Sequence, residues 1–202
     1  MTRDELSQSI DFDLSGAVFL ITYHPVTLDT EGPERGVNAL LAALDSFPGA
    51  RIVFTKANAD MAGRAVNEQV EAYVNQHADR MILTSSLGQL RYLSLVSEAN
   101  VVIGNSSSGL IEVPAVGTPT VNIGDRQQGR LRAPSVIDCE DTTEAIRTAI
   151  EKAQSSAMQA TAAQRQSPYG AGGASKAIVE HIKSADLDGI LVKSFHDIAV
   201  HG

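Results

Sequence analysis

The chain has 202 residues, of which 43% are hydrophobic and 20% are charged. This composition supports a sizeable core and excludes wholesale disorder. Its 16 Lys and Arg residues stand against 24 Asp and Glu residues, a formal net charge of −8. That balance argues against proteins that bind nucleic acid or anionic membranes through excess positive charge. A local phosphate site stays compatible with it, because backbone N–H groups and a few arginines can hold an anion.

Cysteine content and hydropathy bear on the compartment. Cys139 is the single cysteine, so the chain can form neither an internal disulfide nor a cysteine-rich zinc site. The apolar runs are of strand length, well short of the roughly 20 residues that a membrane helix needs. Residues 1–9 are polar and lack the apolar core of a signal peptide. We therefore expect a cytoplasmic protein without a membrane segment.

Short apolar runs alternate with longer amphipathic segments along the chain. The first run, AVFLIT at residues 17–22, is rich in β-branched and aromatic residues, as in strands buried on both faces. In chain order, the pattern predicts strand 17–22, helix 33–44, strand 51–55, helix 61–77, strand 80–84, helix 87–99, strand 101–103, helix 109–116, strands 119–123 and 135–137, and helices 142–153 and 175–185. Such alternation implies βαβ units and a parallel sheet with helices on both faces.

The expected domain organisation is simple. Residues 1–16 read as a polar, poorly ordered lead, and residues 196–202 as a tail. The glycine-rich piece at residues 170–173 is too short for a domain linker. We therefore predict one α/β domain over residues 17–195, with a doubly wound, Rossmann-like parallel sheet.

The strongest candidate site is the sequence GNSSSG at residues 104–109, between a predicted strand and a predicted helix. Small residues let backbone N–H groups approach an anion, and the following helix adds its positive end. The loop is neither a Walker loop nor a dinucleotide fingerprint. Ser106, Ser107 and Ser108 are therefore candidate phosphate ligands. From spacing alone, an ordinary serine N-cap with a glycine turn is an equal alternative.

Charged residues near the same predicted sheet edge are further candidates. Glu112 could accept hydrogen bonds from ribose hydroxyls, although a carboxylate early in a helix more often only complements the helix dipole. Arg126 and Arg130 lie on the loop after strand 119–123. They could bind a pyrophosphate bidentately, or they could be solvated surface charge.

His24 ends the first predicted strand. It could carry a proton or neutralise a phosphate, although a lone histidine is more often structural. The loop at residues 56–60 could supply an amide or a carboxylate to the same crevice. The histidines and carboxylates have no metal-ligand spacing, and there is no Gly-x-Ser-x-Gly elbow. We expect neither a metal site nor acyl-transfer chemistry.

Six segments together resemble the carboxyl-terminal domain of the UDP-N-acetylglucosamine 2-epimerase family. They are TYHPVTL (22–28), NAD (58–60), GNSSSGLIE (104–112), GTP (117–119), DRQQGR (125–130) and PYG (168–170). They run in the family's order and cover the chain from Ala17 to about Phe195. The resemblance is to the hydrolysing branch, which forms N-acetylmannosamine for sialic-acid synthesis, since the non-hydrolysing branch usually has Asp-Ser-Gly-Gly where this chain has residues 105–108.

The resemblance implies one half of a two-domain glycosyltransferase-B-type fold that binds UDP without a cofactor. Ser106, Ser107 and Ser108 would contact the phosphates and Glu112 the ribose hydroxyls. Arg126, with Arg130 on the same loop, would lie on the phosphate side. The family reaction eliminates UDP across C1–C2 of the sugar to a glycal, which is then hydrated with inversion at C2.

By the same resemblance, Asn58 and Leu87 would border the uracil and ribose, and His24 would reach the reacting centre as a catalytic residue. The family's amino-terminal domain supplies the acidic groups for proton transfer, and this chain has no counterpart of it. We expect the chain to be inactive alone and to need that domain as its partner, in a full-length enzyme that can be a homo-oligomer. Two alternatives are a stand-alone UDP or UDP-sugar binding module and the carboxyl-terminal domain of a glycosyltransferase-B sugar transferase. The RQQGR segment argues against the transferase.

Overall fold

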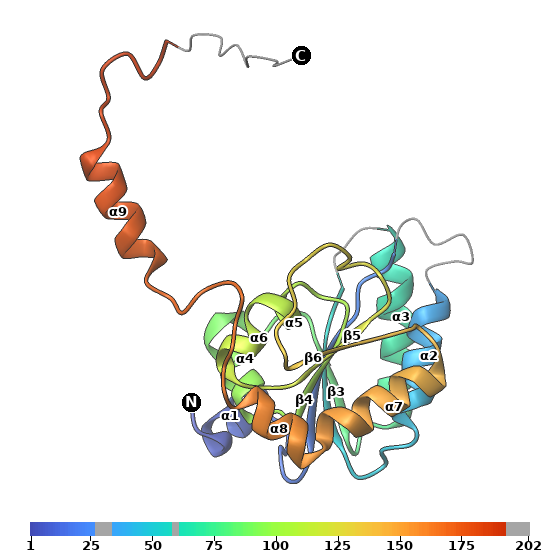
Figure 1. The fold of residues 1–202 in the computed structure, drawn as a ribbon. Helices are drawn as coiled ribbons and strands as arrows, with labels where there is room; N and C mark the ends of the chain where they lie inside the picture. The colour runs from blue at the N-terminus through green and yellow to red at the C-terminus, as the bar shows by residue number, and fades with distance from the viewer. Residues whose placement is uncertain (27–33, 58–60, 193–202) are drawn as a thin grey trace. The chain divides into compact units, whose positions relative to one another are not determined.

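The computed structural model describes residues 1–26, 34–57 and 61–192 (Figure 1). The chain divides into two compact units, Met1–Tyr169 and Gly170–Gly202. This division differs from the predicted single domain over residues 17–195.

Met1–Tyr169 is built on a parallel sheet with the strand order β3-β2-β1-β4-β5-β6. Its strands are β1 (Val18–Thr22), β2 (Arg51–Thr55), β3 (Met81–Thr84), β4 (Val101–Gly104), β5 (Thr120–Ile123) and β6 (Val136–Cys139). This is the order of a Rossmann-type sheet, so the predicted doubly wound α/β fold is confirmed. All six predicted strands are present, with shifts of one or two residues at their ends.

The central strand β1 shows why these residues form the middle of a sheet. Phe19 and Ile21 enter one hydrophobic cluster, and Val18 and Leu20 enter the other, because successive side chains point to opposite faces. All four side chains are fully buried. Both faces of the strand are covered, as its continuous apolar run predicts.

The helices form a layer on each face of the sheet (Figure 1). One layer holds α2 (Glu34–Leu44), α3 (Met61–Gln76) and α7 (Thr143–Gln154); the other holds α1 (Arg3–Ile10), α4 (Gly88–Glu98), α5 (Ser108–Ile111) and α6 (Val113–Val116); α8 (Ser156–Ala162) follows α7. None of the helices in the described part of the chain is both long and apolar enough to cross a membrane.

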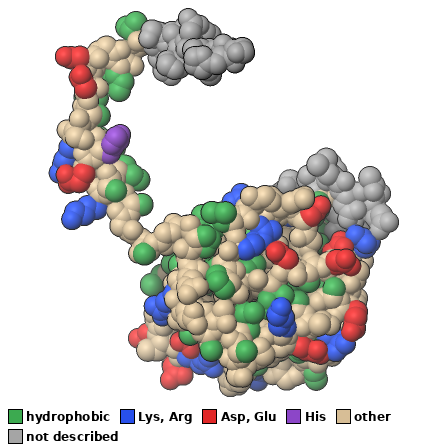
Figure 2. All heavy atoms as spheres, viewed as in Figure 1, with side chains coloured by type: hydrophobic (Ala, Val, Ile, Leu, Met, Phe, Trp, Pro, Cys, Tyr) green, Lys and Arg blue, Asp and Glu red, His purple; other side chains and the backbone are tan. Residues whose placement is uncertain are grey.

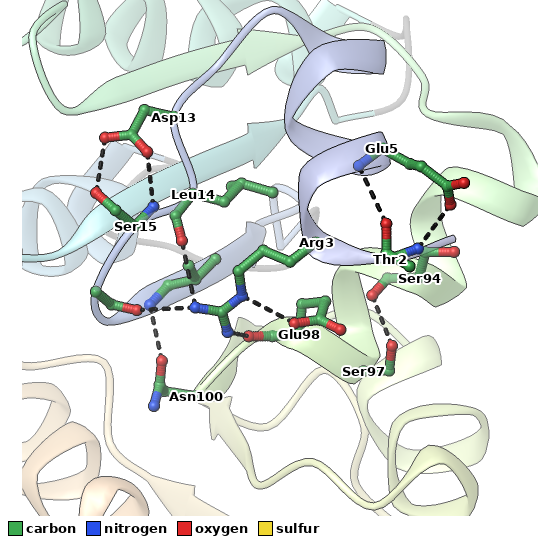
Figure 3. A network of polar contacts seen from close by, with 12 residues as sticks. Thr2, Arg3, Glu5, Asp13, Leu14, Ser15, Ser94, Ser97, Glu98 and Asn100 are labelled. Carbon is green, nitrogen blue, oxygen red and sulfur yellow. Dashed lines mark hydrogen bonds and ion pairs between the residues drawn. The ribbon is translucent and has the colours of Figure 1, made fainter.

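The prediction of a poorly ordered lead over residues 1–16 is wrong. Helix α1 begins with a capping box between Thr2 and Glu5, and it buries Leu6 completely. Arg3 holds the helix against α4: its guanidinium forms an ion pair of 2.8 Å with Glu98 and also donates to the Glu98 carbonyl at 2.9 Å (Figure 3). Leu14 is buried in the same hydrophobic cluster as Leu6. The cap, the two buried apolar side chains and the contacts of Arg3 with Glu98 together order this polar segment.

Two other segments differ from the prediction. The helix expected at residues 109–116 is two short helices, α5 and α6, which break at Glu112 with Pro114 in the first turn of α6. Helix α8 was not predicted. It is capped by Ser155, whose hydroxyl accepts a hydrogen bond from the Met158 N–H at 3.3 Å, and such caps stabilise helices that lack a strong apolar pattern.

The second unit contains the predicted last helix, α9 (Ala174–Ser184). The helix begins after Gly173, whose φ of 84° lies in the left-handed region that favours glycine. It is amphipathic but buries none of its residues. Its apolar side chains Ile178, Val179 and Ile182 are all exposed.

Candidate nucleotide-binding site

The strand order reverses between β1 and β4. From β1 the sheet continues through β2 to β3, and from β4 it continues through β5 to β6. Ligands of open α/β sheets bind beyond the carboxyl ends of the strands at such a switch point. His24 follows β1 here, and the loop at residues 104–109 follows β4.

A cleft of about 500 Å³ opens at this edge of the sheet, a volume within the range of small-molecule sites. Strands β1 and β2, the segment before α4, α4 itself and the loop after β4 all contribute to it. It is lined by Thr22, Thr55, Lys56, Ser85, Ser86, Leu87, Gly88, Gln89, Tyr92, Leu93, Ser106, Ser108 and Glu112. Four of the predicted site residues therefore share one cleft.

Residues 104–108, called the serine loop below, lead from the last residue of β4 to the first residue of α5, and Gly104 lies directly against β1. Gly104 has a φ of 137°, and a Cβ at this position would lie 1.9 Å from the Thr22 carbonyl oxygen, so only glycine fits. Among the described residues, the backbone N–H groups of Ser106 and Ser107 have no acceptor. Ser107 precedes α5 without a side-chain cap bond. The loop therefore offers two backbone donors beside the cleft, the feature that anion sites use.

Asn105 joins the ends of β1 and β4. Its fully buried side chain accepts from the His24 N–H at 2.7 Å and donates to the His24 carbonyl at 2.7 Å. The side-chain amide thus continues the hydrogen-bond ladder beyond the two strands, because it carries one donor and one acceptor like a peptide. Sequence reasoning missed this role. The one feature of the sequence that could have indicated this role is an amide side chain among serines at the end of a predicted strand.

The loop after β5 also contacts Asn105, through its backbone carbonyl. Arg126 Nη1 and Gln127 Nε2 donate to the Asn105 carbonyl oxygen at 3.0 and 2.7 Å. Gln127 is buried, with 2% of its surface exposed. The Arg130 side chain is exposed, and neither it nor Arg126 is among the lining residues of the cleft. The arginine in this region with the most partners is Arg132, which pairs with Asp138 at 3.1 Å and was not predicted.

Tyr92 connects α4 to the serine loop. Its hydroxyl shares a hydrogen bond of 2.6 Å with the Ser108 hydroxyl. Burial raises the pKa of Tyr92; the hydrogen bond to Ser108 lowers it, and the nearby charge of Glu112 raises it again. The net shift is upward, so Tyr92 stays protonated at neutral pH. Glu112 is an exposed carboxylate on the wall of the cleft, where it can accept hydrogen bonds from a ligand.

The structure thus brings Leu87, Ser106, Ser108 and Glu112 together at the cleft, with Ser107 on the same loop. Asn58 lies outside the described residues. Within residues 1–26, 34–57 and 61–192, no group of three or more His, Cys, Asp or Glu side chains could hold a metal ion.

The sheet order, the switch-point cleft and the serine loop define the class: a Rossmann-type α/β domain with a candidate nucleotide site. Residues 1–183 match the model of the family described as UDP-N-acetylglucosamine 2-epimerase, and the chain belongs to that family.

Two curated relatives cover most of the chain. It is 38% identical over 199 residues to the GDP/UDP-N,N'-diacetylbacillosamine 2-epimerase (hydrolyzing) of Campylobacter jejuni, which covers 98% of this chain and 51% of the relative. It is 33% identical to the polysialic acid biosynthesis protein P7 of Escherichia coli, over 89% of this chain and 46% of that protein. The chain spans about half the length of the curated relatives it matches.

The chain also matches solved structures of the same fold, over about half the length of each of those structures. A putative UDP-N-acetylglucosamine 2-epimerase from Listeria monocytogenes superposes with a TM-score of 0.70 at 19% identity, covering 99% of this chain and 50% of that one. The complex of S. aureus MnaA with UDP gives a TM-score of 0.66 at 17% identity, and the match covers 88% of this chain and 47% of that one. At these identities the likeness shows a shared fold.

Proposed function

We propose that the chain is the nucleotide-binding half of a hydrolysing UDP-sugar 2-epimerase, converting UDP-N-acetylglucosamine and water to N-acetylmannosamine and UDP in the full-length enzyme. The single observation that carries the proposal is the cleft at the switch point. Ser106 and Glu112 both line this cleft, and Ser107 lies on the same loop as Ser106; the backbone N–H groups of both serines have no acceptor among the described residues. A nucleoside diphosphate needs donors for its phosphates and an acceptor for its ribose, and these residues offer both.

In this proposal Ser106, Ser107 and Ser108 hold the diphosphate. When UDP leaves the sugar, negative charge develops on the diphosphate, and fixed backbone donors stabilise such charge. Leu87 is nearly fully buried at the cleft and borders the uracil and ribose, with Asn58 as a further proposed contact. Arg126 and Arg130 add positive charge on the phosphate side.

His24 is the proposed catalytic residue. It follows β1 at the switch point, and the two hydrogen bonds between its backbone and Asn105 fix its place there. The remaining proton-transfer groups are proposed to come from the amino-terminal half of the full-length enzyme, because the chain spans about half of its curated relatives. A homo-oligomeric full-length enzyme is part of the same proposal.

The identity of the amino sugar in the substrate is best tested with two sugar nucleotides. The Campylobacter jejuni relative is named for a diacetamido sugar nucleotide, whereas the family is described by UDP-N-acetylglucosamine. The 202-residue chain is expected to bind UDP and to release neither N-acetylmannosamine nor the corresponding diacetamido sugar from these substrates. Release above background would contradict the half-enzyme proposal. Transfer of the sugar to an added acceptor would instead favour the sugar transferase, which the family match disfavours.

Glu112 gives the sharper binding experiment. If its carboxylate accepts from both ribose hydroxyls, the chain should prefer UDP to 2′-deoxy-UDP by about 5- to 150-fold, since a charged acceptor loses a donor. Glu112→Gln should shrink this preference and leave the melting temperature nearly unchanged. The control is Glu98→Gln. Glu98 is a carboxylate of α4 that pairs with Arg3, and its substitution should leave the preference for UDP over 2′-deoxy-UDP unchanged. Calorimetry with both ligands decides, and an unchanged ratio in Glu112→Gln would remove the ribose assignment.

A further inference from the structure

One peptide group links the loop after β5 to the serine loop. The carbonyl of Asn105 accepts two side-chain hydrogen bonds, one from Arg126 at 3.0 Å and one from Gln127 at 2.7 Å. The N–H of the same peptide group belongs to Ser106, which lines the cleft. That N–H has no acceptor among the described residues.

Because the peptide is trans, holding the Asn105 carbonyl in place also fixes the direction of the Ser106 N–H. No peptide bond in the described residues is cis, so the carbonyl of Asn105 and the N–H of Ser106 point in opposite directions across one rigid plane. Holding the carbonyl toward the loop after β5 therefore fixes the N–H on the side away from that loop. A charged donor on the carbonyl also polarises the peptide, which makes the N–H a stronger donor.

Gln127 is the informative member of the pair because it is too buried to touch a ligand in the cleft. Only 2% of its surface is exposed, and its Oε1 has no partner among the described residues. A buried acceptor without a partner costs stability, so an apolar side chain of similar size would suit the packing better. What the glutamine provides, and a leucine would not, is the Nε2 hydrogen bond to Asn105.

We propose that Gln127 is a positioning residue: through the Asn105–Ser106 peptide it aims the Ser106 N–H at a phosphate oxygen of the bound nucleoside diphosphate. This inference rests on the proposed function. Arg126 holds the same carbonyl, so its charge acts on the anion at least partly through the backbone. In the DRQQGR segment, Arg126 and the first glutamine thereby share one physical role, which is to hold the Asn105 carbonyl.

Gln127→Leu, with Gln128→Leu as a matched control, tests the proposal on the full chain. Gln128 is the next residue, is exposed, and receives the same substitution. We expect Gln127→Leu to weaken UDP binding by about 3- to 10-fold, the value of one neutral hydrogen bond, and to leave uridine binding within about twofold. In the ligand-free protein, the amide ¹⁵N resonance of Ser106 should shift in Gln127→Leu and stay in place in Gln128→Leu.

The outcomes separate the two proposals. If the wild-type chain binds UDP no better than uridine, the proposed function fails and this inference fails with it. If the wild type prefers UDP and Gln127→Leu keeps both that preference and the Ser106 resonance, the proposed function stands and the positioning role is overturned. Should Gln127→Leu fail to fold, Gln127→Met is measured instead, since methionine is close to glutamine in size and also lacks the Nε2 donor. The Ser106 resonance must then shift before any ligand is added, and an unchanged resonance overturns the proposal.

Discussion

Helices α7 and α9 have similar lengths and similar amphipathic patterns, yet they meet different surroundings. In α7, the apolar residues Ile146, Ala149, Ile150 and Ala153 are all buried, and the helix packs on α2, β5 and β6. In α9, no residue is buried, and Figure 2 shows hydrophobic side chains along the surface of this unit. A helical pattern thus predicts the helix and its apolar face, but it does not reveal what covers that face.

The two units also differ in what they contribute to the candidate site. Every residue that lines the cleft belongs to Met1–Tyr169, which also holds both hydrophobic clusters. In the described part of the second unit, large apolar side chains after α9 are exposed as well, with Leu191 at 95%. Stability and ligand binding should therefore depend on the first unit.

The largest expected difference between the two helices is in the free energy of unfolding. Ile146→Ala removes a fully buried side chain from α7 and should cost about 2–5 kcal/mol, through lost transfer free energy and the cavity left behind. Ile178→Ala is the matched change in α9, where the side chain is 57% exposed, and it should stay within about 0.5 kcal/mol. Urea denaturation of both variants measures the pair. Equal losses would mean that α9 is packed as tightly as α7.

A smaller difference is expected in thiol chemistry. Burial raises the pKa of Cys139 to about 12, and the charges of Asp138 and Asp141 add to the shift. The thiolate is the reactive form, so alkylation of Cys139 at pH 8 should be slow. Ser184 lies at the exposed end of α9, and Ser184→Cys in a Cys139→Ser background should react about 100-fold faster or more, because its pKa stays near 8.5. Iodoacetamide rates give the comparison.

The pH dependence checks the cause of that rate difference. A raised pKa keeps the thiol protonated, so the rate at Cys139 should continue to climb above pH 9, where the rate of the exposed cysteine levels off. Equal rates at pH 8, or a plateau for Cys139 near pH 9, would contradict the burial of this side chain.

The sequence predicted the strands, most helices and the α/β class because buried parallel strands are continuous apolar runs. It missed α1, whose only fully buried residue is Leu6 and whose order depends on contacts of Arg3 with Glu98, 95 positions away. The position of the serine loop and of Glu112 near the switch point could be predicted from the strand ends, whereas their binding roles stay predictions. Asn105 and Gln127 could not, because their roles arise from hydrogen bonds between loops that only the folded chain brings together.

The smallest expected effect is that of removing the second unit. A chain that ends at Tyr169 retains every residue that lines the cleft. Its affinity for UDP should stay within about twofold of the full chain, a difference of less than about 0.5 kcal/mol. Calorimetry on both chains makes the measurement. A large loss of affinity would show that the second unit contributes to binding, and would contradict the assignment of the UDP site to the first unit.

The central claim is that the serine loop of the first unit binds the phosphates of UDP. Its most direct test is calorimetric titration of the full chain with UDP and with uridine, before and after Ser106→Ala with Ser107→Ala. We expect the wild type to prefer UDP, because both the backbone N–H groups and the hydroxyls of the loop can donate to the phosphates. The double variant keeps the backbone N–H groups and removes both hydroxyls, so it should lose about 10- to 150-fold in UDP affinity, as for a hydrogen bond to a charged group, with uridine affinity nearly unchanged. Equal losses for both ligands, or no preference for UDP in the wild type, would contradict the account.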